Sequence, residues 1–267
     1  MSIPLAFLHG LPTSAPELSL GEHLAAAVTD SGRISTLLDC LPSTDAPALW
    51  SSDTTRSPLS HAALRRFVAA FVLPTSGVHH QQFAPNDRVM VVLPTSPENA
   101  VALLAVSSYH ACAPVNSTCT AGELFDDARR LGAKAVLTTP EAADRLELSR
   151  LRDELRCEVV FLHPRADGPA GLFDLSVMGY GASVDAFVEK PSAVPSKLHG
   201  LHDQSLVLHT SGTSGKKKVS GFVVTCCAEP LLLTTPQVVP YTLRSLIVGT
   251  CAVMHSWELR PDDVNSE

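Results

Sequence analysis

The sequence RVMVVLPTSPENAVALLAVSSYHACAPV, residues 88–115, carries the clearest structural signal in the chain. Its beginning, Arg88–Leu93, is a compact apolar run stopped by Pro94, which is typical of a buried strand. Pro97 then stands in the first turn of a helix that we expect to continue to Tyr109, since proline is tolerated at that position. A second apolar run follows at Ala111–Val115. The stretch therefore predicts a strand, a helix and a second strand in succession.

The alternation of strands and helices continues on both sides of this stretch. Downstream, Ala121–Leu131 carries acidic residues early and two arginines late, as the helix dipole favours, and Gly132 follows it. Upstream, Ser60 is the expected N-cap of a helix whose apolar residues recur at spacings of three and four from Leu64 to Phe71. The remaining expected elements are strands at 133–137, 157–162 and 205–209, a helix at 140–155, and a surface connection at 168–197. This order predicts an α/β fold with a largely parallel sheet flanked by helices.

The composition excludes several classes of protein. The chain has 267 residues, 45% hydrophobic and 18% charged, so it is long enough for a substantial core and unlike a disordered protein. Its formal net charge of -7 argues against a nucleic-acid partner, because proteins that bind the phosphate backbone carry a basic excess. No run of about 18 apolar residues predicts a membrane span. We expect an intracellular protein, cytoplasmic or organellar, without a clear targeting signal.

The cysteines and histidines suggest no metal site. Seven cysteines are scattered without a CxxC pair, and they form no zinc-ligand pattern with the eleven histidines. The odd cysteine count and the irregular spacing favour reduced thiols over a disulfide framework. We therefore assign no metal-binding residue to this chain.

A polar loop directly follows the strand expected at Ser205–His209. It reads TSGTSGKKK, residues 210–218. Its two glycines permit backbone conformations closed to other residues and let main-chain N–H groups approach a ligand. Four hydroxyls add hydrogen-bond donors, and three lysines add positive charge. This combination after a strand favours a polyphosphate site, although the loop is neither a Walker A loop nor a dinucleotide fingerprint.

The segment from His209 to Lys218 resembles the signature loop of the adenylate-forming superfamily, which includes acyl-CoA synthetases, luciferases and peptide-synthetase adenylation domains. The usual loop has two Ser/Thr, Gly, two Ser/Thr, Gly, any residue, Pro and Lys. Only Lys217 departs from it, because proline is usual at that position. Further segments resemble the same superfamily in the same order, and together they extend the resemblance from about residue 55 to residue 264: 86–105, 113–116, 121–124, 131–135 and 241–264.

The resemblance implies a fold, a site and an activity. It implies the incomplete N-terminal part of an adenylate-forming large domain, with residues 1–55 as an extension and the start of the domain and 56–267 as a truncated AMP-binding domain. The residues that would wrap the β- and γ-phosphates of ATP are Thr210, Ser211, Gly212, Thr213, Ser214 and Gly215, and Lys218 would be the motif lysine. The relatives use ATP with Mg²⁺ to convert a small-molecule carboxylate into acyl-AMP and pyrophosphate. Many then transfer the acyl group to CoA.

An insertion separates the loop from the next family segment. Residues 219–237 are largely apolar, and the superfamily has no counterpart for them. A splice-donor pattern can encode Val219-Ser220, and a stretch ending in a splice acceptor can encode Pro236-Gln237. We therefore interpret this insertion as a translated intron, and a genuine surface insertion is the alternative.

The chain ends at Glu267, before the segments that hold adenine and ribose in the relatives and before their mobile C-terminal domain. Adenylation requires stabilisation of the charge on the transferring phosphorus, and one loop supplies only part of it. We therefore assign no catalytic residue and expect no turnover by the isolated chain. Two alternatives remain: a non-catalytic half-domain that binds a nucleotide or a partner, and an unrelated α/β protein whose Ser/Gly/Lys turn is accidental.

Overall fold

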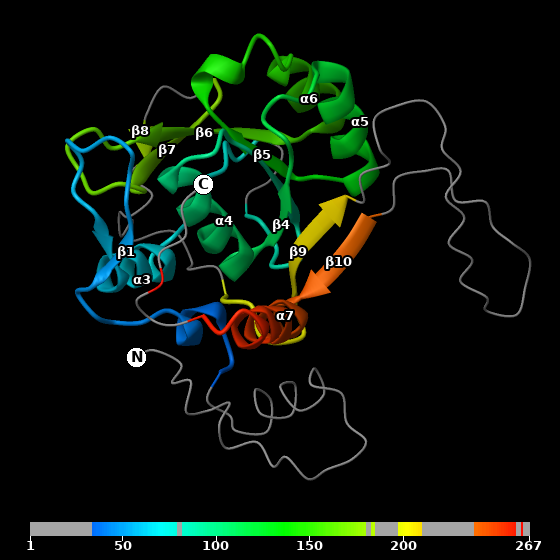
Figure 1. The fold of residues 1–267 in the computed structure, drawn as a ribbon. Helices are drawn as coiled ribbons and strands as arrows, with labels where there is room; N and C mark the ends of the chain where they lie inside the picture. Colours follow the sequence, from blue (N-terminus) through cyan, green and yellow to red (C-terminus); the bar gives the residue numbers. More distant parts are fainter. Residues whose placement is uncertain are drawn as a thin grey trace, which may run out of the picture.

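The computed structural model describes residues 34–78, 82–179, 183–184, 197–209, 238–259 and 263. The strands of its main sheet are β3 (Arg88–Val92), β4 (Ala111–Pro114), β5 (Ala135–Thr138), β6 (Glu158–Pro164), β7 (Phe173–Val177), β8 (Ser183–Val184), β9 (Gln204–His209) and β10 (Val238–Thr242). Within the described residues these eight strands follow the order β10-β9-β4-β3-β5-β6-β7-β8 (Figure 1). The five strands from β9 to β6 are parallel, and β10, β7 and β8 are antiparallel to their inner neighbours. The predicted largely parallel sheet is confirmed.

Two helices have the bounds that the sequence predicts. These are α4 (Pro97–Tyr109) and α5 (Ala121–Leu131). The Ser96 hydroxyl caps α4 by accepting from the N–H of Asn99 at 3.1 Å. Gly132 ends α5 in the left-handed region at φ 60, which glycine adopts without strain. Local capping signals were therefore sufficient to define both helices.

The helices cover both faces of the sheet because alternate strand residues point to opposite sides. Helix α4 and helix α3 (His61–Ala69) pack on the face that carries Val89 and Val91. On the other face, which carries Met90 and Val92, helix α5 packs beside α6 (Leu148–Leu155). Helices α4, α5 and α6 thus each connect two parallel strands and cover one face of the sheet.

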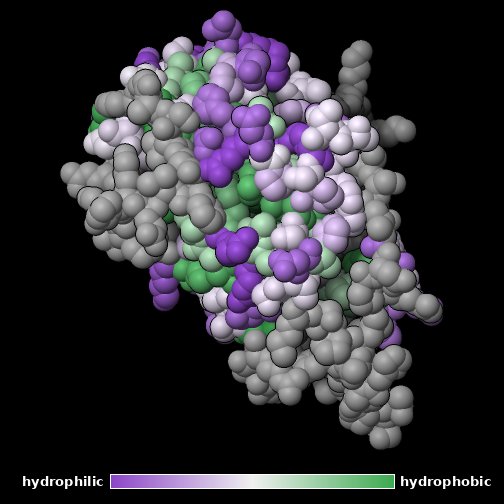
Figure 2. All heavy atoms as spheres, turned by 90° about the vertical axis from the view of Figure 1, so that its left-hand side faces the viewer, coloured by the Kyte–Doolittle hydropathy of each residue, from purple (hydrophilic) through white to green (hydrophobic). Residues whose placement is uncertain are grey.

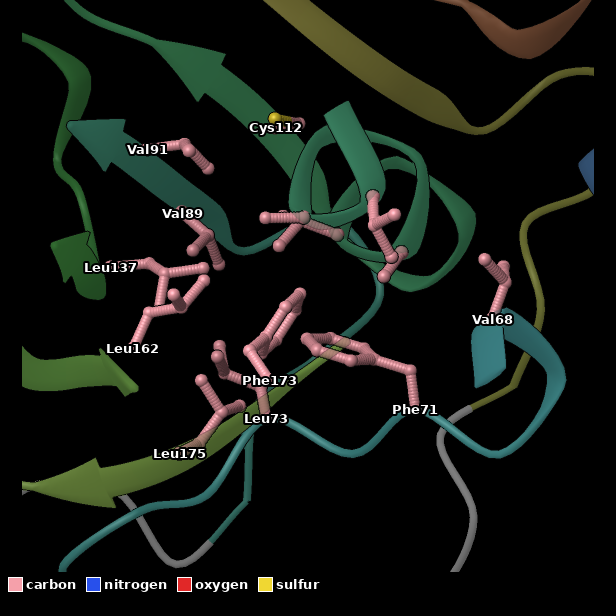
Figure 3. Close-up of a cluster of buried hydrophobic side chains, with 14 of the residues drawn as sticks. Val68, Phe71, Leu73, Val89, Val91, Cys112, Leu137, Leu162, Phe173 and Leu175 are labelled. Atoms are coloured by element: carbon pink, nitrogen blue, oxygen red, sulfur yellow. The ribbon is translucent and has the colours of Figure 1, made fainter. Parts of the chain in front are cut away.

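Aromatic side chains fill the cluster under α3 and α4. The rings of Phe67 and Phe173 meet edge to face, with their centroids 4.9 Å apart. Figure 3 shows Phe71 pointing toward Phe173, with Leu137 and Leu162 of the sheet beside them. Phe173 is fully buried, so its side chain packs residues 173–177 against the hydrophobic core.

The helix expected at 140–155 is wrong in its first half. A short 3-10 helix, η2 (Pro140–Ala142), is followed by turns, and α6 begins only at Leu148. Glu147, just before α6, has a positive φ of 48, which no continuous helix allows. The irregular segment lets the Arg145 guanidinium reach the carbonyls of Ser117 and Cys119 at 2.8 and 2.7 Å. Hydrogen bonds to carbonyls distant in the sequence thus stabilise an irregular segment where a helix was expected.

The connection expected at 168–197 also contains strands. Strand β7 pairs antiparallel with β6, and β8 pairs with β7. The alternation of Phe173, Leu175 and Val177, all buried, is the period-two sequence signal for β7. Residues 180–182 and 185–196 of this segment lie outside the described residues.

The other end of the sheet is formed by β9 and β10, with α7 (Leu243–Ser256) next to them (Figure 1). Strand β10 contains Pro240, which donates no hydrogen bond and is therefore found on edge strands, as here. Helix α7 packs through Leu243 and Ile247 against the 3-10 helix η1 (Leu37–Cys40). A separate hairpin of β1 (Pro47–Leu49) and β2 (Leu59–Ser60) leads into α3. Among the described residues, no helix combines the length and the apolar character needed to cross a membrane.

Candidate functional site

The carboxyl ends of the parallel strands lie at one common edge of the sheet. The order in which the chain adds strands reverses at β3. From β3 the chain moves to β4 on one side, and it then returns to β5 on the other side of β3. Because α4 and α5 cover opposite faces, a crevice is expected between the carboxyl ends of β3 and β5. Open α/β sheets bind ligands at such a switch point. This edge is therefore the candidate functional region.

A buried hydrogen bond joins the carboxyl ends of β3 and β5. The Thr138 hydroxyl at the end of β5 donates to the Val92 carbonyl at the end of β3, at 2.8 Å. Thr138 is fully buried. The bond satisfies both groups inside the chain, so this pair holds the edge rigid and offers no free polar group to a ligand.

The N-terminus of α4 lies at the same edge of the sheet, and its first turn carries the buried carboxylate of Glu98. The side chain of Glu98, 6% exposed, accepts hydrogen bonds from the Gly171 N–H at 2.9 Å and from the Arg56 guanidinium at 2.6 Å. Burial raises the pKa of Glu98, but these two hydrogen bonds outweigh it and hold the pKa below its usual value. A fixed negative charge therefore already compensates the positive end of the α4 dipole.

Gly171 is required at this contact. Its φ is +93, and a Cβ would lie 2.9 Å from the Cγ2 atom of Val101 in α4. A side chain here would therefore push the Gly171 N–H away from Glu98.

The N-terminus of α5 is also occupied by the chain itself. Thr120 and Glu123 form a capping box, in which the Glu123 carboxylate accepts from the Thr120 N–H at 2.8 Å. This backbone hydrogen bond and a second one from the Thr120 hydroxyl lower the pKa of Glu123. Neither α4 nor α5 therefore presents an open anion site at its N-terminus.

Strand β9 ends at this edge, and the predicted phosphate loop begins at the next residue in the sequence. The loop residues Thr210, Ser211, Gly212, Thr213, Ser214, Gly215 and Lys218, and the insertion at 219–237, lie outside the described residues. Both ends of the connection are described, because His209 of β9 pairs directly with Val238 of β10. The connection 210–237 therefore leaves and re-enters the sheet at the carboxyl end of β9, beside β4.

A second hollow lies on another part of the surface. It is a cleft of about 130 Å³ between α3 and the turn after β6, lined by Ala63, Arg66, Phe67, Arg165 and Leu172. Figure 2 shows apolar side chains gathered at the centre of this face with hydrophilic ones around them. The cleft is smaller than the roughly 300 Å³ at which pockets for drug-sized ligands begin. The β6–β7 turn that lines it follows a strand four positions from β9 in the sheet, so the cleft is no part of a site at the loop.

Two fully buried cysteines have raised pKa values. Burial raises the pKa of Cys112 and of Cys157 to about 12 in each case. Both therefore remain protonated at neutral pH, and a protonated thiol is a poor nucleophile. The expectation of reduced thiols agrees with the five described cysteines, all of which are free.

Comparison with known families identifies the sequence pattern. The sequence model of the family described as AMP-binding enzyme matches residues 43–221, which covers more than half of the chain. No protein of curated function matches the chain in sequence.

Solved structures of two proteins share the fold. Apo MatB from Rhodopseudomonas palustris is similar at a TM-score of 0.56 and 19% identity, over 92% of this chain and 39% of that one. ATP-bound MatB from the same organism gives 0.54 and 20%, over 92% and 39%. The acyl-CoA synthetase of Brucella canis gives 0.50 and 18%, over 78% and 32%. The chain thus spans about two fifths or less of the length of these structures, and at such identities the likeness establishes the fold alone.

Proposed function

The chain belongs to the family of AMP-binding enzymes, and on that premise we propose that residues 210–218 bind the phosphates of Mg-ATP. In this proposal the backbone N–H groups and hydroxyls of Thr210–Gly215 surround the β- and γ-phosphates, and Lys218 adds a positive charge. Membership of the family removes the alternative of an unrelated α/β protein with an accidental turn.

The single observation that carries the proposal is the place of β9. Its carboxyl end lies at the edge where β3, β4 and β5 also end, and the Ser/Thr-Gly-Lys sequence starts at the next residue. Ligands of α/β sheets bind at this edge. The two helix N-termini described there are already compensated by Glu98 and Glu123. The sequence that follows β9 adds three lysines, Lys216, Lys217 and Lys218, which supports the proposal that the loop binds phosphate.

The reaction that we propose for the whole protein is the activation of a carboxylate. A carboxylate oxygen attacks the α-phosphorus of ATP, the bond from that phosphorus to the bridging oxygen breaks, and acyl-AMP and pyrophosphate form. A loop that holds the β- and γ-phosphates stabilises the leaving pyrophosphate and keeps it in line with the attacking oxygen. Transfer of the acyl group to CoA is the proposed second step.

Isothermal titration of the purified chain with Mg-ATP tests the binding. We expect saturable binding that the Lys218→Ala substitution weakens by about tenfold, because one charge-assisted contact to phosphate is lost. Lys197→Ala is the matched control, since Lys197 is an exposed lysine before β9. It should bind Mg-ATP as the unchanged chain does. Equal affinities for the two variants, or no binding by the unchanged chain, would refute the phosphate site.

Exchange of labelled pyrophosphate into ATP in the presence of carboxylates distinguishes the ligase from the second proposal, a half-domain that binds nucleotide without turnover. We expect binding without exchange for the 267-residue chain. Exchange that depends on an added carboxylate would show that this chain alone carries out adenylation.

We also propose that residues 219–237 are not part of the mature protein. Their removal would join Lys218 to Val238, where β10 begins and pairs with His209. The loop would then be a short connection between two paired antiparallel strands. Sequencing of the mature transcript decides the question, and a message that retains these codons would disprove the idea.

A further inference from the structure

Strand β9 pairs along its length with β10, and further contacts before its first residue join it to the rest of the fold. Its parallel register with β4 is described at one pair, Cys112 with Leu206, whereas β3 pairs with β4 along Arg88–Val91. Its other neighbour, β10, is an edge strand. The residues just before β9 therefore add contacts to a strand that has one described pair with β4 and an edge strand as its other neighbour.

A buried histidine holds those residues. His199 is 1% exposed, and its backbone N–H donates to the carbonyl of Ser108 in α4 at 2.8 Å. Its ring Nε2 lies 2.7 Å from the carbonyl of Pro85, and its Nδ1 lies 3.2 Å from the hydroxyl of Ser205 in β9. A carbonyl only accepts, so Nε2 carries a hydrogen and donates it to Pro85. One imidazole thus links β9 to the segment that precedes β3.

A second buried histidine supports the same segment. His110 follows α4, is 1% exposed, and its Nδ1 donates to the carbonyl of Ala84 at 3.2 Å. Two neighbouring carbonyls, those of Ala84 and Pro85, are therefore each held by a buried imidazole. The charged group nearby is Asp87, whose carboxylate accepts from the Ala84 N–H at 2.8 Å. Backbone groups of the segment 84–87 are thus hydrogen-bonded to the side chains of His110, His199 and Asp87.

We infer that His199 is a positioning residue for the proposed phosphate loop. It fixes β9 to the segment before β3, and β9 in turn places residue 210 at the carboxyl edge of the sheet. The inference rests on the proposed function, because positioning matters only if the loop binds phosphate. His199 itself lies at the opposite end of β9 from the loop, so it acts through the strand and does not touch the nucleotide.

Three substitutions at this position separate positioning from general stability. His199→Leu removes both ring contacts. His199→Gln places an amide N–H near the Nε2 position, so it can still donate to Pro85, whereas His199→Asn ends near the Nδ1 position and cannot reach that carbonyl. Ser76→Ala is the matched control, since it removes the 2.6 Å hydrogen bond to buried Glu158 at the start of β6, four strands from β9.

Mg-ATP affinity and hydrogen exchange of the β9 amides are measured for each variant. We expect His199→Leu to weaken Mg-ATP binding by about tenfold and to lower protection at Leu206–Leu208, because a buried acceptor is left unpaired. His199→Gln should bind several-fold more tightly than His199→Asn. Ser76→Ala should lower overall stability without changing either measurement at β9.

The outcomes distinguish this inference from the proposed function. Unchanged affinity and unchanged β9 protection in His199→Leu overturn the positioning role. Equal binding by the Gln and Asn variants also overturns it, and this comparison still decides if the Leu variant does not fold. If the unchanged chain binds no Mg-ATP, the proposed function fails and the positioning role for a phosphate loop falls with it. Loss of β9 protection would then show only that His199 holds the strand.

Discussion

The centre of the sheet and its β9–β10 end are held in different ways. Strands β3, β5 and β6 pair along their lengths and lie between two apolar clusters that include Phe173 on one face and Leu124 on the other. At the other end, α7 contributes only Leu243 and Ile247 to a small cluster, and β9 is fastened by the polar contacts of His199. The comparison teaches that the centre of the scaffold is stabilised by burial on both faces, whereas the strand that leads to the candidate site has one fully buried apolar side chain, Val207, and is also held by hydrogen bonds at its start. Segments that bind ligands often have lower local stability than the core.

Truncation of the central aromatic cluster should have the largest effect. Phe173→Ala removes a fully buried ring that contacts Phe67, and we expect it to lower the free energy of unfolding by about 4 kcal/mol. Ile247→Ala in the small cluster at α7 should cost only about 2 kcal/mol, because fewer buried groups surround it. Urea denaturation followed by circular dichroism measures both. Equal losses would contradict the difference between the two regions.

Breaking the buried ion pair should have the next largest effect. Arg56→Met leaves the Glu98 carboxylate buried with the Gly171 N–H as its remaining partner, and we expect a loss of about 3 kcal/mol. The double variant Arg56→Met/Glu98→Leu should recover part of this loss, because no charge is then buried. A double-mutant cycle by urea denaturation tests this, and additive losses would rule out the coupling.

The pH dependence of stability should report on His110. Burial lowers the pKa of His110 to about 4, whereas the unfolded value is about 6.5. The unfolded chain therefore binds the proton first, so stability is complete above pH 6.5 and is lost as the pH falls from 6.5 toward 4. We expect a loss of about 2.5 kcal/mol between pH 7 and pH 4.5 from this group.

His110→Asn is the control for this prediction, because an amide N–H can still donate to the Ala84 carbonyl but does not titrate. Its stability should depend less on pH over the same range. A slope identical to that of the unchanged chain would assign the acid sensitivity to other groups.

Deletion of residues 219–237 should have the smallest effect on stability. It shortens the connection between the paired residues His209 and Val238 roughly threefold, and loop closure then costs about 1 kcal/mol less. We expect the deletion variant to be more stable by that amount in urea denaturation and to bind Mg-ATP more tightly. Lower stability or weaker binding would mean that the segment contributes to the fold.

The sequence predicted the elements whose signals are local. Helices α4 and α5 have the predicted bounds because Ser96, Thr120 and Gly132 cap them, and each cap acts within its own turn. The helix expected at 140–155 was wrong because the contacts of Arg145 with the carbonyls of Ser117 and Cys119 depend on residues distant in sequence. The site residues at 210–218 remain a prediction from their sequence pattern.

The sequence by itself determined the succession of strands and helices from β3 to β5 and the membership of a family, because capping, periodicity and the glycine-hydroxyl-lysine pattern are encoded in neighbouring residues. Only the tertiary structure decided that Glu98 is paired with Arg56 and Gly171, and that His110 and His199 hold consecutive carbonyls before β3. These partners lie far apart along the chain, and burial makes the hydrogen bond of each polar group obligatory. No local pattern specifies which distant group will satisfy it.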